Sequence, residues 1–136
     1  MYHDALVRLS REATGAGRLE APGGTAVVDN PLCGDRVTVD VRLEGGKVAA
    51  LAHEVRGCLL CQASAAILGR LGPGSTGEEI AAAREGLVAM LDGAPPPAGR
   101  FAELAVFEPV RSVKSRRRCA VLPFEALGEA IARAGR

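Results

Sequence analysis

Apolar and polar residues alternate along residues 36–43, the period of a strand with one buried face. The apolar positions of this stretch are Val37, Val39, Val41 and Leu43. Gly45 and Gly46 then supply a hairpin turn, and residues 48–56 have the composition of a returning strand. Residues 25–30 are also strand-like. The pattern therefore predicts three antiparallel strands.

Helical spacing of apolar residues appears on both sides of these strands. Residues 2–13 and 60–71 each have an apolar face at this spacing, and the second stretch ends in a Gly-Pro-Gly sequence. Ser75 or Thr76, followed by two glutamates, has the form of a helix cap. We therefore expect a third helix that runs to about Leu91.

Two more helices are expected towards the C-terminus, over residues 101–107 and 123–134. Because strands come first and most helices follow, the predicted fold class is α+β: a three-stranded antiparallel sheet with helices packed mainly on one face. A chain of 136 residues fits a single domain, 1–136, with a core that needs no disulfides.

The formal net charge of +1 indicates neither nucleic acid nor a membrane surface as the main partner. No apolar run approaches the roughly 20 residues of a membrane span, and the N-terminus lacks the layout of a signal peptide. These features predict a cytoplasmic protein. In that reducing compartment its four cysteines are expected to be metal ligands or reactive thiols rather than disulfides.

Cys33 and Asp35 lie in one turn, between Pro31 and the first residue of the alternating stretch. Proline and glycine in this turn fix the backbone so that the thiol and the carboxylate point the same way. A thiolate and a carboxylate are both zinc ligands. The alternative is that Asp35 is an ordinary turn residue and Cys33 a structural thiol.

Cys58 follows Gly57 at a predicted helix start, where backbone amides and the helix dipole stabilise a thiolate. Cys61 completes a Cys-x-x-Cys sequence with it, which is found in redox pairs and in zinc sites. The sequence leaves open whether Cys61 takes part in the chemistry or only packs beside the site.

Cys119 follows three arginines, Arg116 to Arg118, whose positive charge favours a thiolate. The same arginines are suited to bind a carboxylate such as Asp35, although such a run is also common on a solvated face. Cys33, Cys58 and Cys119 with Asp35 make a complete four-ligand set for zinc or iron. The alternative is that all three cysteines are simply buried.

Taken together, three motifs in order resemble the U-type iron-sulfur cluster assembly family, the IscU, SufU and NifU N-terminal proteins. They are Asn30 to Asp35, Gly57-Cys58 with Ala63-Ser64, and Cys119 with the segment that follows it. The resemblance runs from Tyr2 to about Ile131. Cys61 departs from it, because the family usually has a small residue such as serine there.

The 61 positions between Cys58 and Cys119 (119 − 58) resemble the spacing of the SufU-like branch. Arg116, three residues before Cys119, also agrees with that branch. The resemblance implies a metal site of Cys33, Asp35, Cys58 and Cys119 without histidine, so His53 is expected to be structural.

The family resemblance implies an iron-sulfur cluster assembly protein that accepts sulfur from a cysteine desulfurase and serves recipient apo iron-sulfur proteins. Cys119 is expected to be the persulfide acceptor, supported by Arg116, with zinc bound at rest and iron or a cluster bound transiently. The protein then acts as a scaffold or as a zinc-dependent sulfur relay. Two alternatives remain: a zinc-stabilised non-catalytic interaction module, and a thiol-disulfide protein using Cys58 and Cys61.

Overall fold

The computed structural model describes residues 2–32 and 34–135. A three-stranded antiparallel sheet in the order β1-β2-β3 forms one layer. Its strands are β1 (Gly24–Asn30), β2 (Asp35–Glu44) and β3 (Lys47–Arg56). The sheet and its antiparallel pairing confirm the sequence-based prediction to within one residue at each strand boundary.

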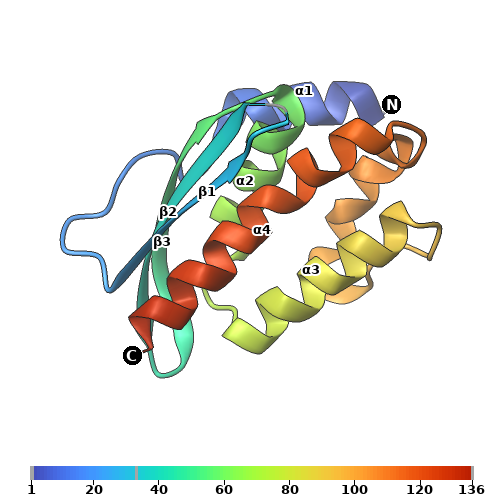
Figure 1. The fold of residues 1–136 in the computed structure, drawn as a ribbon. Coiled ribbons are helices and arrows are strands. Elements are labelled where there is room, and N and C mark those ends of the chain that lie inside the picture. The colour runs from blue at the N-terminus through green and yellow to red at the C-terminus, as the bar shows by residue number, and fades with distance from the viewer. Residues whose placement is uncertain (1, 33, 136) are drawn as a thin grey trace.

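Helices cover one face of this sheet, as Figure 1 shows. They are α1 (Tyr2–Glu12), α2 (Leu59–Leu71), α3 (Gly77–Leu91), the 3-10 segment η1 (Gly99–Ser112) and α4 (Lys114–Ala134). Helix α4 packs on β1 and β2, α2 packs on β3 and α4, and the remaining helices pack around these two. The buried valines of β2 face this helical layer, which confirms an α+β fold with its core between the two layers.

The cap of α3 also follows the sequence pattern. Thr76 is the N-cap, its hydroxyl accepts a hydrogen bond from the backbone N–H of Glu79 at 3.1 Å, and the Glu79 carboxylate accepts one from the N–H of Thr76 at 2.9 Å. This reciprocal capping box fixes where the helix begins. Among the described residues, none of the helices is long and apolar enough to cross a membrane.

Residues 13–23, which connect α1 to β1, form a structured segment against the sheet. Gly15 and Gly17 exchange backbone hydrogen bonds with His53 at the free edge of β3. Arg18 then binds the carboxylate of Asp40 at 2.6 Å, on the face of β2 opposite the helices. The segment therefore closes one edge of the sheet and part of its second face, where the loop lies to the left in Figure 1.

The last helix begins earlier than the sequence suggested. A start at about Pro123 was expected, but α4 begins at Lys114 and contains Pro123 in its interior. Residues 119–122 are buried against α2 and the sheet, and this burial outweighs the cost of a helical proline, roughly 3 kcal/mol. Ser64 of α2 also donates to the carbonyl of Ala120 at 2.6 Å, which gives that part of the helix a second hydrogen-bond partner.

Candidate metal centre

Asp35 is the first residue of β2, and its side chain points to the helical face like those of the buried valines that follow. It is only 3% exposed. Its Oδ1 accepts a hydrogen bond from the backbone N–H of Cys58 at 3.2 Å. Its Oδ2 is buried and has no hydrogen-bond partner among the described residues. A buried carboxylate oxygen without a partner is costly unless a cation binds it.

Gly57 makes this position of the carboxylate possible. A Cβ atom at residue 57 would lie 2.7 Å from Oδ1 of Asp35, closer than any side chain tolerates. The absence of a side chain therefore lets β2 bring its carboxylate up to the start of α2. The sequence showed a glycine before Cys58, but only the structure gives the reason for it.

Cys58 is the N-cap of α2, with an extended backbone at φ −73° and ψ 171°. Its side chain is half-buried, whereas Cys119, on the second turn of α4, is fully buried. One ligand atom each from Asp35, Cys58 and Cys119 lies within 4.8 Å of the other two. Thiolate ligands of a tetrahedral zinc lie about 3.8 Å apart, so small side-chain movements would bring this trio onto one ion.

The donor set also fits a metal chemically. Two sulfur ligands favour zinc, iron or an iron-sulfur cluster, and the carboxylate is a harder ligand that iron and zinc also accept. Cys33, the fourth predicted ligand, lies outside the described residues. Its place in the site therefore remains a prediction, which rests on its position two residues before Asp35 in the sequence.

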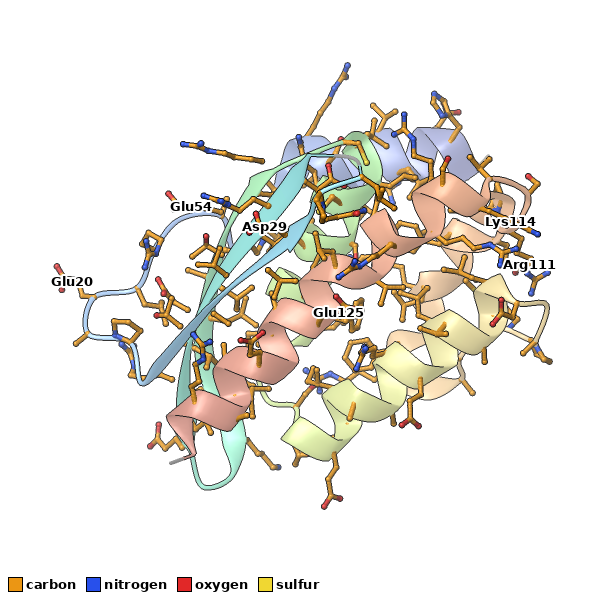
Figure 2. The ribbon with its side chains drawn as sticks, in the orientation of Figure 1. Glu20, Asp29, Glu54, Arg111, Lys114 and Glu125 are labelled. Atoms are coloured by element: carbon orange, nitrogen blue, oxygen red, sulfur yellow. The ribbon has the colours of Figure 1, made fainter. Side chains whose placement is uncertain are left out.

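Two of the three arginines before Cys119 bind partners outside the candidate site, because the triplet winds around α4 with its helical period. Arg117 binds Asp92 at 3.0 Å and the carbonyl of Arg111. Arg118 pairs with Glu125, labelled in Figure 2, at 3.4 Å. The predicted pairing of this triplet with Asp35 is therefore wrong for these two arginines, and Asp35 instead accepts from Cys58.

Arg116 is exposed and belongs to a groove on the surface. It lines an apolar groove of about 390 Å³ together with Leu60 of α2 and Val113, the residue before α4. This groove adjoins the metal centre in sequence, because Leu60 and Arg116 lie within three positions of Cys58 and Cys119. The supporting role of Arg116 in sulfur transfer remains a prediction.

His53 is placed in the core, away from the trio. It is 4% exposed, and its Nε2–H donates to the carbonyl of Thr14 at 2.8 Å. Burial lowers the pKa of His53, which favours the neutral ring. The possible metal group that the described residues form consists of Asp35, Cys58 and Cys119, and the ligand set that the sequence implied remains a prediction.

Cys61 lies one helical turn after Cys58 and is fully buried. Burial raises the pKa of the Cys61 thiol, and the negative charges of Asp35 and Cys58 raise it further. The thiol therefore stays protonated beside a charged site. Among the described residues, no disulfide joins Cys58, Cys61 or Cys119.

Comparisons with known proteins show the family of this chain. The family model of the NifU-like N terminal domain matches residues 1–120. The chain belongs to this family. This result confirms the resemblance to the U-type iron-sulfur cluster assembly family that the three motifs had suggested.

A relative from Thermotoga maritima, named iron-sulfur cluster assembly scaffold protein IscU, is 26% identical over the whole of this chain and 96% of its own. The crystal structure of a nitrogen-fixing NifU-like protein (N-terminal) from Brucella abortus has a TM-score of 0.94 and 36% identity, covering 98% of this chain and 94% of that one. A SUF-system scaffold structure from Fervidobacterium islandicum, described there as putative, has a TM-score of 0.87 at 23% identity, covering 94% of each chain, and is similar in fold.

Proposed function

We propose that this protein assembles iron-sulfur clusters on Cys33, Asp35, Cys58 and Cys119. The observation that carries the proposal is the approach of Asp35, Cys58 and Cys119 to within 4.8 Å of one another from a strand and two helices. Family membership and the IscU relative support the same function. Iron and sulfide are the cargo, and the thiolates bind them because soft sulfur ligands suit iron.

Asp35 makes the cluster easier to release. A carboxylate binds an iron of a cluster more weakly than a thiolate does, so one of the four ligands exchanges readily. The backbone N–H of Cys58 holds one carboxylate oxygen and leaves Oδ2 for the metal. Without iron, the same four residues are suited to bind zinc, which we propose for the resting protein.

Sulfur is delivered by a cysteine desulfurase and received as a persulfide on Cys119, and finished clusters pass to apo iron-sulfur proteins. The buried position of Cys119 means that the site must open for the desulfurase to reach it. We place this chemistry in the cytoplasm, where thiols stay reduced.

One observation favours a second function. A fully buried Cys119 is also what a purely structural zinc site needs, as in a zinc-stabilised interaction module. Such a module would bind zinc, keep it and accept no sulfur. The two functions use the same ligand set. They differ in whether the site exchanges its metal and accepts sulfur.

The deciding experiment is reconstitution under anaerobic conditions with ferrous iron, cysteine and a cysteine desulfurase, followed by analysis of iron, zinc and sulfide. Assembly predicts bound iron with a comparable amount of sulfide, and transfer of both to an apo-ferredoxin. A protein that keeps its zinc and takes up neither iron nor sulfide contradicts the proposal and supports the interaction module.

A further inference from the structure

Cys61 is the one described cysteine that the proposed function leaves without a role. It lies three residues after Cys58, on the first turn of α2. The hydrogen bond from the N–H of Gln62 to the carbonyl of Cys58, at 3.1 Å, closes that turn. Residues three apart on a helix have Cβ atoms about 5–6 Å apart, and a disulfide brings its Cβ atoms to about 3.5–4.5 Å, so closure needs a shift of roughly 1–2 Å. The two thiols are therefore neighbours that can be bridged with small adjustments.

The surroundings of the two thiols differ. Cys58 is half-buried and stands at the end of the helix, whereas Cys61 is fully buried behind it. Because Cys61 follows Cys58 by one helical turn, it lies beside the metal centre. A partner protein can contact Cys58, whereas it cannot contact Cys61 while the site is closed. While the site is closed, Cys61 can therefore react only with groups of the same molecule.

We propose that Cys61 is a resolving thiol that reduces a persulfide on Cys58 and releases its sulfur as sulfide. The inference rests on the proposed function, because sulfur must first reach the site. Cluster assembly needs sulfur as sulfide, whereas a desulfurase supplies it at the oxidation level of a persulfide. Cys61 provides the two electrons of this reduction together with Cys58.

The reaction has two balanced steps. First, the Cys58 thiolate attacks the outer sulfur of a Cys119 persulfide, which leaves a Cys119 thiolate; the two Sγ atoms lie within 4.8 Å. Second, the outer sulfur of the Cys58 persulfide takes the proton of the Cys61 thiol, and the resulting Cys61 thiolate attacks Sγ of Cys58. A Cys58–Cys61 disulfide forms as the sulfur–sulfur bond of the persulfide breaks. The proton of the Cys61 thiol leaves with the hydrosulfide. A dithiol reductant then restores both thiols.

The sequence makes the test direct, because trypsin cleavage after arginine separates the cysteines. Cys58 and Cys61 share the peptide from residues 57 to 70, and Cys119 begins the peptide from residues 119 to 133. The protein is incubated anaerobically with a cysteine desulfurase and cysteine, without external thiol, then alkylated, digested and analysed by mass spectrometry. Free sulfide is measured in parallel.

In the unmodified protein, we expect the 57–70 peptide to lose two hydrogens, as a disulfide requires, while sulfide appears. In Cys61→Ala and Cys61→Ser, the same peptide should keep one extra sulfur. Sulfide release should fall at least about tenfold, because an internal thiol acts at a far higher effective concentration than thiols in solution. Added dithiol should restore the release, which shows that the variants still receive sulfur.

The control variant is Ser64→Ala, which removes the hydrogen bond between α2 and α4 but no thiol. It should release sulfide like the unmodified protein, so that disturbed helix packing does not explain the effect of Cys61→Ala. Sulfide release from Cys61→Ala at the unmodified rate overturns the inference, as does extra sulfur found only on the 119–133 peptide. Absence of extra sulfur from every cysteine peptide of every variant instead contradicts the proposed sulfur acceptance itself.

Discussion

The carboxylate of Asp35 accepts a hydrogen bond from the backbone N–H of Cys58 at 3.2 Å. This bond joins the first residue of β2 to the N-cap of α2. The bond holds one oxygen of the carboxylate and leaves the other buried without a partner among the described residues. One side chain therefore combines a structural contact with a candidate metal-binding oxygen. Variants of these residues separate the two roles.

Replacement of Asp35 by alanine should slow the release of a bound cluster, because only thiolates then hold it and the exchangeable carboxylate is gone. It should also lower zinc affinity, because one of four ligands is lost. Cluster transfer to an apo-ferredoxin measures the first effect. Asp35→Asn is the matched control, since its amide oxygen can still accept from Cys58 but its charge is gone. Transfer at the unmodified rate in both variants would mean that Asp35 is only a turn residue.

Gly57→Ala should weaken metal binding although residue 57 is no ligand. The new Cβ would lie 2.7 Å from Oδ1 of Asp35 and push the carboxylate away from the cysteines. We expect a loss of zinc affinity of at least about tenfold, as for other residues that position ligands. Gly128→Ala on α4 is the control, because a Cβ there meets open space. Equal zinc affinity in the two variants would refute the positioning role.

Serine in place of Cys33, Cys58 or Cys119 should reduce the amount of zinc or iron retained, because serine is a poor ligand for these metals. Cys61→Ala should retain nearly all of it. Metal analysis of the purified variants, each checked for folding by circular dichroism, provides the measurement. If Cys61→Ala lost as much metal as Cys58→Ser, the ligand set assigned to the site would be wrong.

Asp40→Asn should destabilise the fold at neutral pH by about 1–3 kcal/mol, the cost of a weakened buried polar network. Asp40 is fully buried, and hydrogen bonds from Arg18 lower its pKa below the usual 3.8. A lowered folded-state pKa stabilises the fold above about pH 4, and this stabilisation is lost as the pH falls through the folded-state value. Urea unfolding from pH 7 to pH 3 should show the two proteins converge, and a constant difference would contradict the assignment.

Thr76→Ala should lower the free energy of unfolding by about 1 kcal/mol, because it removes one half of the α3 capping box. Metal content should stay unchanged, since the cap lies on α3 and the candidate ligands do not. Thermal unfolding of the zinc-loaded protein, with Ser112→Ala as an exposed hydroxyl control, measures the effect. A simultaneous loss of zinc would show that α3 supports the site.

The predicted elements agreed best with the structure where local physics decides them. The alternation of residues 36–43 specifies a half-buried strand, and the Thr76 cap specifies where α3 begins, because both depend on near neighbours in the chain. The start of α4 was missed because the helix before Pro123 is stabilised by the burial of residues 119–122 against distant elements. The ordered path of residues 13–23 was missed for the same reason: its partners, His53 and Asp40, lie on other strands.

The sequence by itself determined the ligand types and their order along the chain, since cysteine and carboxylate side chains carry their metal chemistry wherever they stand. Only the tertiary structure decided that Asp35, Cys58 and Cys119 meet, that Gly57 leaves room for the carboxylate, and that Arg117 and Arg118 turn to Asp92 and Glu125. The physical reason is that the direction in which a side chain points depends on the packing of its helix or strand. A side chain's chemistry is local, but what it faces is set by the sheet and helices that the whole core holds together.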